Sequence, residues 1–118
     1  MKIGIDVVDV ERIKKLISKK KFIERVFSQR EIIYCERFKN KWERYAAKFA
    51  AKEAVIKTLK SSANFPLKLR DIEILNTKNG EPYVFIKGFN IKGSLSISHI
   101  SLVAVAVFIL ENYERNKN

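Results

Sequence analysis

The chain begins with a strand-like alternation of side chains and then changes to helical spacing. Over Ile3–Val8 the isoleucines and Val7 fall on one face, while Gly4, Asp6 and Val8 fall on the other, which predicts a short strand. Asp9 can cap a helix that begins near Val10. From Arg12 to Arg25 an apolar stripe at helical spacing lies among lysines and arginines, which predicts a basic amphipathic helical region.

Two further helices are predicted before the middle of the chain. The run Ser28-Gln29-Arg30-Glu31 has the form of a capping box and predicts a helix that extends to Lys39. Trp42–Lys60 contains neither glycine nor proline and is rich in alanine, which makes it the strongest helical prediction. Near one face of that helix lie Ala46, Phe49, Ala50, Glu53, Ile56 and Leu59.

The second half of the chain has the shorter periodicity of strands separated by turn residues. Strands are predicted over Leu69–Leu75, Tyr83–Ile86, Leu95–Ser98 and Leu102–Leu110, and Asn79-Gly80 predicts a hairpin between the first two. We expect a loop over Ser61–Pro66, a break at Asn90–Gly93, a tight turn around His99–Ser101 and a frayed polar tail over Asn112–Asn118. The order β-α-α-α-β-β-β-β predicts one α+β domain, residues 1–118, with a mostly antiparallel sheet.

Composition describes a folded and strongly basic domain. The 118 residues carry 24 Lys+Arg against 13 Asp+Glu, which gives a formal net charge of +11, and 47% of them are hydrophobic. This apolar content excludes a disordered polycation. A chain this short buries only about two thirds of its unfolded surface, so we allow for further burial through oligomerisation. The charge indicates an anionic partner, such as nucleic acid, an acidic protein, a phosphate-rich ligand or a membrane surface.

Several protein classes are excluded by individual residues. One cysteine, Cys35, excludes a disulfide framework, and one cysteine with one histidine cannot supply the ligands of a structural zinc site. Asp6 comes too early for the apolar segment of a secretory leader. The longest apolar run, Leu102–Leu110, is far shorter than the roughly 20 residues of a membrane helix. We therefore expect a soluble cytoplasmic protein in which Cys35 is a free thiol.

Asp6 is the first candidate for chemistry, because aspartate is depleted in strands. Gly4 lies two residues away on the same face and permits close approach of another backbone or a ligand. The alternative interpretation is an edge-strand carboxylate that caps a helix or pairs with a lysine.

Glu53 is the second candidate, because it places a carboxylate on the apolar face of the predicted helix. Burial of a charge costs on the order of several kcal/mol unless it is paired or binds a metal. The alternative is an i,i+4 ion pair with Lys57, which contributes about 0.2–0.5 kcal/mol. If Asp6 and Glu53 converge, their carboxylates form a suitable seat for Mg²⁺, which completes its shell with water and substrate phosphates. Lys48, Lys52 and Lys57 of the same helix would then attract the phosphates.

His99 is the third candidate, at the end of the run Ser96-Ile97-Ser98-His99. It is either a surface residue at a turn or part of a polar cluster that binds a phosphate or positions a nucleotide. The chain has no Walker motif and no Gly-x-Gly-x-x-Gly, so a glycine-loop nucleotide fold is not indicated.

Three segments, in this order, resemble the motifs of one enzyme family. These are Gly4-Ile5-Asp6-Val7 with Glu11-Arg12-Ile13, then Phe49-Ala50-Ala51-Lys52-Glu53-Ala54, then Ser96-Ile97-Ser98-His99. They resemble holo-[acyl-carrier-protein] synthase, the small trimeric type of 4′-phosphopantetheinyl transferase. The resemblance runs from about Ile3 to Glu111 and includes the hairpin Asn79-Gly80-Glu81-Pro82.

The resemblance implies Mg²⁺-dependent transfer of 4′-phosphopantetheine from coenzyme A to a serine of apo acyl carrier protein, with release of 3′,5′-ADP, a step of fatty acid and lipid biosynthesis. It also implies a sheet packed against a long helix and a homotrimer with active sites between subunits. The metal ligands would be Asp6 and Glu53, and Lys57 would act beside them as a catalytic phosphate contact. The remaining coenzyme A contacts would be Lys48 and His99 near the 3′-phosphate, with Gly80 and Pro82 beside the adenine.

The chain departs from the family pattern at two places. Lys48 stands where the family usually has arginine, and a lysine provides a point charge rather than a bidentate fork. Binding of coenzyme A is therefore expected to depend more on neighbouring residues. The family's Gly-rich loop after the long helix is Ser61-Ser62-Ala63 here, which puts in doubt any contact that needs a positive φ.

The implied reaction is attack of the serine oxygen on the β-phosphorus of the pyrophosphate. Mg²⁺ on the pyrophosphate would neutralise the developing charge. Glu53 could take the serine proton directly or through a metal-bound water, and we favour the water because a carboxylate on Mg²⁺ is a weak base. The basic helical region suits the acidic recognition helix of a carrier protein. Its docking candidates are Arg12, Lys19, Lys21 and Arg25, with Leu16 as an apolar anchor.

A small nucleic-acid-binding module is the alternative function, because a net charge of +11 on an α+β domain would suit it. Such a module would interleave aromatic and basic residues on a sheet face. This chain instead concentrates charge on its N-terminal helical region, whose Phe22 and Phe27 fit a core. The transferase is favoured, with neither nucleic acid nor membrane as a partner; a charged face without a role is the third possibility.

Overall fold

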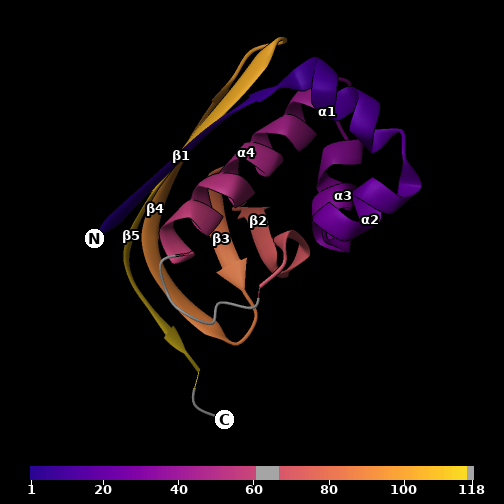
Figure 1. Ribbon diagram of the computed structural model, residues 1–118. Coiled ribbons are helices and arrows are strands. Elements are labelled where there is room, and N and C mark those ends of the chain that lie inside the picture. The colour runs from indigo at the N-terminus through magenta and orange to yellow at the C-terminus, as the bar shows by residue number, and fades with distance from the viewer. Residues whose placement is uncertain (61–66, 117–118) are drawn as a thin grey trace.

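The computed structural model describes residues 1–60 and 67–116. Its helical half contains β1 (Lys2–Asp9), α1 (Val10–Ile17), α2 (Lys20–Val26), α3 (Gln29–Glu36) and α4 (Lys41–Leu59). A 3-10 helix, η1 (Leu69–Asp71), precedes β2 (Ile72–Asn76), β3 (Pro82–Ile86), β4 (Phe89–His99) and β5 (Val103–Arg115). This order confirms the α+β class, and Figure 1 shows α4 running through the middle of the molecule.

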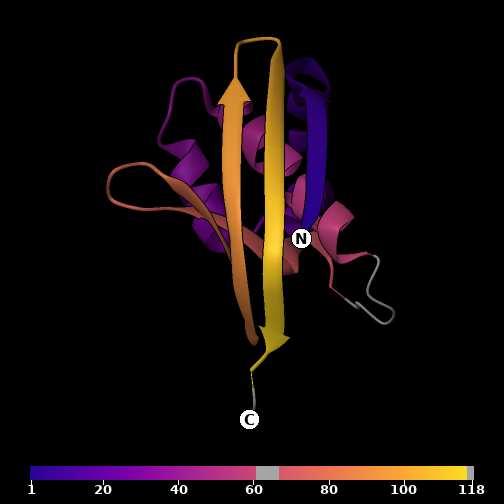
Figure 2. The same cartoon turned by 90° about the vertical axis from the view of Figure 1, so that its left-hand side faces the viewer.

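Two antiparallel sheets flank α4. One has the strand order β1-β5-β4 and the other pairs β2 with β3. Figure 2 shows the three-stranded sheet from its outer face, with the helices behind it. Helix α4 packs on the inner face of that sheet, and α1 and α3 contact the opposite side of α4. The antiparallel sheet packed against a long helix is therefore confirmed.

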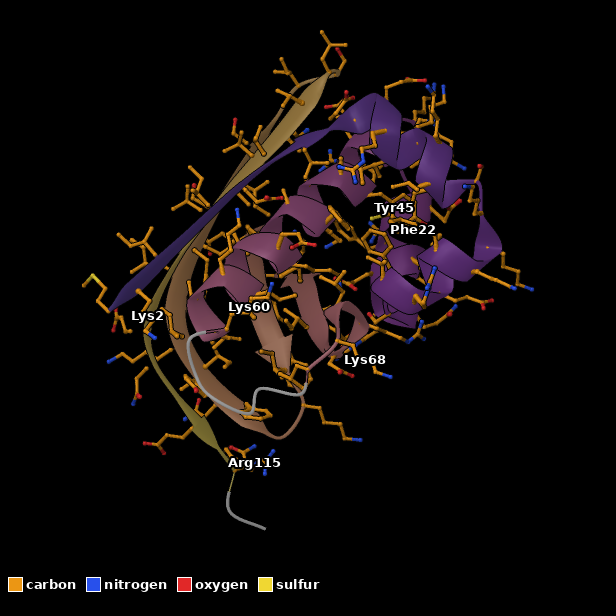
Figure 3. All side chains as sticks on the ribbon, viewed as in Figure 1. Lys2, Phe22, Tyr45, Lys60, Lys68 and Arg115 are labelled. Carbon is orange, nitrogen blue, oxygen red and sulfur yellow. The ribbon has the colours of Figure 1, made fainter. Side chains whose placement is uncertain are left out.

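Helix α4 is buried on more than one face, which differs from the single apolar face predicted. Four consecutive residues, Tyr45, Ala46, Ala47 and Lys48, are all buried. The small alanine side chains let the sheet and the other helices approach the helix closely from opposite sides. Figure 3 shows Tyr45 and Phe22 between α4 and the N-terminal helices. Glu53 itself is half-buried.

The helix caps predicted from sequence are present. Asp9 accepts hydrogen bonds from the backbone amides of Glu11 and Arg12, which fixes the start of α1. Ser28 and Glu31 form the capping box of α3. The basic helical region is interrupted before Lys20, so the described chain has separate helices α1 and α2 there, and α3 ends at Glu36 rather than Lys39.

One predicted strand, one predicted break and the predicted tail were wrong in part. The segment Leu69–Leu75 begins as the 3-10 helix η1 and becomes extended only at Ile72. The break predicted at Asn90–Gly93 is instead a register shift between Lys92 and Gly93 within a continuous β4, because a bulge absorbs the extra residue without ending the pairing. The predicted frayed tail is paired as far as Arg115, which lies opposite Phe89.

The outer face of the three-stranded sheet is apolar and exposed. Ile3, Ile5 and Val7 of β1 are 66%, 57% and 64% exposed, whereas Gly4 and Val8 on the other face are buried. The outward residues of β1 pair with Val105, Val107 and Ile109 of β5. No helix of the described residues is long and apolar enough to cross a membrane.

Candidate active site

Asp6 is held beside α4 by the close packing of β1 on that helix. Two residues earlier on the same face, Gly4 lies against the helix backbone, where an added Cβ would be 1.9 Å from the carbonyl oxygen of Ala54. The absence of a side chain at Gly4 therefore sets the distance between β1 and α4. It brings the Asp6 carboxylate, 19% exposed, to the helix surface that carries Glu53 and Lys57.

Lys57 ties the two elements together at this point. Its ammonium donates to the carbonyl oxygen of Ile5 at 2.7 Å and lies 3.4 Å from an Asp6 carboxylate oxygen. The lysine partner expected in the alternative interpretation of Asp6 is thus present. Lys57 forms its ion pair with Asp6. The helical spacing had instead suggested a pair between Lys57 and Glu53.

The two candidate carboxylates interact electrostatically. Burial, and then the charge of Asp6, raise the pKa of Glu53, although the nearby Lys60 and Lys57 act in the opposite direction. Figure 3 shows Lys60 at the C-terminal end of α4. A divalent cation between two carboxylates would relieve this repulsion. Two carboxylates also suit Mg²⁺, which keeps several bound waters and binds oxygen atoms of the substrate. Among the described residues no group of three or more His, Cys, Asp or Glu side chains could hold a metal.

A second part of the site is a pocket of about 150 Å³ between α3, α4, β2, the start of β3 and the end of β4. All four residues expected around the nucleotide line it: Lys48, Gly80, Pro82 and His99. Gly80 has a φ of 88°, which a glycine adopts without steric cost in the turn before β3. The structure therefore brings together segments from the middle and the end of the chain.

His99 belongs to a polar cluster rather than to an isolated surface turn. Its Nδ1 lies 2.8 Å from a carboxylate oxygen of Glu43, and its side chain is 24% exposed. The carboxylate orients the ring, as carboxylates commonly do for functional imidazoles. Glu43 was not foreseen in the sequence, although it lies in the first turn of α4, five residues before Lys48.

Lys48 lines the pocket but is already hydrogen-bonded. Its ammonium donates to the carbonyl oxygen of Ile74 at 2.6 Å and to the side-chain oxygen of Asn76 at 2.7 Å. The same nitrogen lies 4.4 Å from the centroid of the Tyr34 ring. Only 4% of Lys48 is exposed, and burial lowers its pKa.

The expectation that Lys52 attracts phosphates was wrong. Lys52 is fully buried on another side of α4, where its ammonium lies 2.6 Å from Glu31 and donates to the carbonyl oxygens of Leu69 and Ile72. All three N–H donors of the ammonium are used by these contacts. This residue therefore fastens α4 to α3 and to the start of β2. Its neighbour Glu53 turns towards β1 because successive helical positions point in different directions.

The docking candidates on the basic helices are accessible. Arg12, Lys19, Lys21 and Arg25 are exposed, and Leu16 is half-buried beside them. Phe27 is buried and Phe22 half-buried, as expected for core aromatics. The predicted Ser61-Ser62-Ala63 departure lies outside the described residues.

Comparison with known proteins places this fold in a class of phosphopantetheine-transferring enzymes. A model of the 4′-phosphopantetheinyl transferase superfamily matches residues 2–113 of this chain. A holo-[acyl-carrier-protein] synthase of Thermodesulfovibrio yellowstonii is 46% identical over 110 residues, which cover 92% of this chain and 96% of that protein.

Solved structures agree. The Helicobacter pylori synthase in complex with coenzyme A has a TM-score of 0.80 and 33% identity, covering 93% of this chain and 100% of that one. The Bacillus anthracis synthase in complex with CoA (3′,5′-ADP) has a TM-score of 0.79 and 34% identity, covering 92% and 93%. The chain therefore belongs to the holo-[acyl-carrier-protein] synthase family of this superfamily. The chain is therefore an enzyme, and the family membership argues against the alternative function of a small nucleic-acid-binding module.

Proposed function

We propose that this chain transfers 4′-phosphopantetheine from coenzyme A to a serine hydroxyl of an acyl carrier protein and releases 3′,5′-ADP, within fatty acid and lipid biosynthesis. One observation carries the proposal beyond the family likeness. Asp6 of β1 and Glu53 of α4 are close enough for the Asp6 charge to raise the pKa of Glu53, and Lys57 lies beside them. Two carboxylates can hold a divalent cation that binds a diphosphate, and the half-exposed ammonium of Lys57 can contact the same diphosphate.

Asp6 and Glu53 are the residues that would hold Mg²⁺. When bound, the ion supplies neutralisation of the charge on the diphosphate. Lys57 has its ammonium within 3.4 Å of Asp6 and a side chain that is 52% exposed, so it can turn to a phosphate oxygen without leaving a buried charge unpaired.

In the transfer, the serine oxygen forms a bond to the β-phosphorus while the bond from that phosphorus to the oxygen of 3′,5′-ADP breaks. The serine proton must leave in the same step. Glu53 is our candidate acceptor, directly or through an intervening water, and we favour the water because a carboxylate that holds Mg²⁺ is itself a weak base.

The nucleotide end of coenzyme A is assigned to the pocket lined by Lys48, Gly80, Pro82 and His99. Turn residues at Gly80 and Pro82 expose backbone against which a flat base can lie. Cationic side chains at the other wall suit the ribose phosphate. These assignments come from the family likeness and from the common lining of one pocket.

A homotrimer with active sites between subunits is the second part of the proposal. Its support is the apolar outer face formed by Ile3, Ile5 and Val7 with the adjoining valines of β5. An exposed apolar patch of this kind typically marks an interface. Asp6 lies on the opposite face of the same strand, so an assembly on the outer face would leave only the thickness of β1 between the neighbouring subunit and this carboxylate.

The carrier protein is assigned to the basic helices. The exposed Arg12, Lys19, Lys21 and Arg25 surround Leu16, which gives a cationic surface with an apolar centre. Complementary charge increases the rate of encounter with an acidic helix. A cytoplasmic location completes the proposal; it is supported by Cys35, a buried free thiol.

The direct test incubates the purified protein with coenzyme A, Mg²⁺ and apo acyl carrier protein and measures the phosphopantetheine adduct by mass spectrometry. We expect modification of the carrier serine and its loss in Asp6→Asn and Glu53→Gln. Glu111→Gln, which removes an exposed carboxylate of β5, is the matched control and should remain active. Full activity of both site variants at saturating Mg²⁺ would refute the metal assignment, and an unmodified carrier with wild-type protein would refute the function.

A further inference from the structure

The pocket contains a second cationic residue that the sequence motifs did not single out. Arg44 lies one helical turn before Lys48 on α4, and both residues line the pocket together with His99. The two cations differ in how far their hydrogen-bonding groups are already used. That difference decides which of them can bind an anion.

Most of the hydrogen-bonding capacity of Lys48 is already used within the protein. Two of its three N–H groups are taken by the Ile74 carbonyl at 2.6 Å and by Asn76 at 2.7 Å, and its ammonium faces the Tyr34 ring at 4.4 Å. Turning it towards a ligand would leave the buried Ile74 carbonyl without this donor. The contacts of Lys48 therefore join α4 to β2 and form the floor of the pocket.

The hydrogen-bonding groups of Arg44 are, in contrast, largely unused. Its guanidinium lies over the Phe38 ring, 4.1 Å from the centroid, and its Nε makes a long hydrogen bond of 3.4 Å to the Asn40 side chain. Among the described residues it forms no ion pair with a carboxylate. Stacking on an aromatic ring fixes the plane of a guanidinium and leaves its in-plane donors available for a bidentate contact.

The electrostatic surroundings suit a multiply charged anion. Glu43 is the nearest acidic residue in sequence, and its carboxylate is engaged by His99 at 2.8 Å. The positive charge of Arg44 and Lys48 is therefore only partly offset within the pocket. A phosphate that carries about two negative charges would be attracted there, and arginine is the side chain whose geometry matches it.

We propose that Arg44, and not Lys48, binds the ribose 3′-phosphate of coenzyme A, and that Lys48 is a positioning residue that holds β2 against α4. This inference rests on the proposed function, because it concerns the same substrate. It explains how a chain with lysine where the family usually has arginine retains a bidentate cation in the pocket. The arginine is supplied from the preceding turn of the same helix.

The test compares coenzyme A with 3′-dephospho-coenzyme A, which lacks only the phosphate in question. Dissociation constants are measured by calorimetry for the full-length protein and for Arg44→Gln. The wild type should prefer coenzyme A, and Arg44→Gln should weaken coenzyme A at least about tenfold while changing 3′-dephospho-coenzyme A less than about twofold, the range of a charged hydrogen bond. Arg37→Gln is the matched control, because Arg37 also lies over the Tyr34 and Phe38 rings but is exposed and does not line the pocket.

A third variant separates the roles of the two cations. Lys48→Met should weaken both ligands by a similar factor and so leave the preference for the 3′-phosphate intact. If Lys48→Met does not fold, the comparison of Arg44→Gln with Arg37→Gln still decides the role of Arg44. Unchanged discrimination in Arg44→Gln, or its selective loss in Lys48→Met, overturns the assignment while leaving the proposed function standing. Wild-type protein that binds neither ligand overturns both.

Discussion

Gly4 and Ala54 are in backbone contact: a Cβ atom on Gly4 would lie 1.9 Å from the carbonyl oxygen of Ala54 and 2.9 Å from its carbonyl carbon. This contact lets β1 approach the backbone of α4 more closely than any residue with a side chain at position 4 would allow. Asp6 lies two residues beyond Gly4 on the strand, and Glu53 precedes Ala54 on the helix. The two proposed metal ligands therefore lie immediately beside the place where the two elements touch.

Gly4→Ala is expected to destabilise the protein and to abolish transfer. The added methyl group cannot be accommodated without moving β1 away from α4, which costs about 1–3 kcal/mol or more in a packed core. Chemical denaturation and the carrier-modification assay measure the two effects. For stability alone, Gly80→Ala is the comparison: its Cβ would meet nothing within 4 Å, so only the positive φ of 88° opposes it. A Gly4→Ala protein with wild-type stability and activity would disprove this account of the packing.

The stability of the metal-free protein should fall as pH rises through the titration of Glu53. Its pKa is raised above 4.5, so between that value and the folded-state pKa the folded chain retains a proton that the unfolded chain has lost. The unfolding free energy therefore decreases with increasing pH in this window. Glu53→Gln lacks this titration and should be more stable than wild type at pH 7 in chelator, with a smaller difference at about pH 4, where the carboxyl is protonated.

Urea unfolding at both pH values measures this effect, with Glu111→Gln as the control for loss of an exposed carboxylate. Mg²⁺ should stabilise the wild type and have little effect on Glu53→Gln, because binding to the folded state alone raises stability. A Glu53→Gln protein that is less stable than wild type at pH 7 would contradict the prediction.

Removing either partner of the buried ion pair between Lys52 and Glu31 should strongly destabilise the fold. Both side chains are fully buried and 2.6 Å apart. Lys52→Met leaves the Glu31 carboxylate without its cation, which is expected to cost about 3–5 kcal/mol. Lys20→Met is the control, because the pair of Lys20 with Glu24 is exposed at 3.9 Å and should change stability by less than about 0.5 kcal/mol. Equal, small effects of the two variants in urea unfolding would show that the buried pair contributes nothing.

Reversing the charge of the basic helices should weaken carrier docking without affecting coenzyme A. Arg12→Glu with Arg25→Glu is expected to raise the KM for apo carrier protein several-fold, with an effect that shrinks at high salt, and to leave the KM for coenzyme A unchanged. Lys87→Glu makes the same charge change at the β3–β4 turn, which Figure 1 places at the other end of the molecule. Equal changes in both KM values would argue against a docking surface.

The assembly proposed across the sheet can be disrupted at Val7. This residue is 64% exposed on the apolar face, so Val7→Lys would bury an ammonium in an interface and is expected to yield monomers by analytical ultracentrifugation. Ile33→Lys, at a 57% exposed position on α3, should leave the mass of the wild-type assembly unchanged. A monomeric wild type, or a Val7→Lys protein of unchanged mass, rules out assembly through this face.

Much of the candidate site could be proposed from the sequence because its residues break local rules. An aspartate in an apolar strand, a glutamate on an apolar helix face and a histidine at a strand end marked Asp6, Glu53 and His99, and the motif likeness added Gly80 and Pro82. Glu43 and Arg44 escaped notice because a glutamate and an arginine in the first turn of a helix look like ordinary solvated charges. Their contacts with His99 and Phe38 depend on elements distant in the chain.

Local signals in the sequence determined the caps at Asp9 and Ser28, the long alanine-rich helix and the hairpin at Gly80, because propensity, capping and turn geometry act over a few neighbouring residues. Only the tertiary structure decided that Lys52 faces Glu31 and not a phosphate, that Lys48 is bonded to β2, and that the apolar face of β1 is the outer one. Helix α4 is covered by the three-stranded sheet on one side and by α1 and α3 on the other. Its sequence periodicity alone therefore could not show which of these elements each side chain contacts.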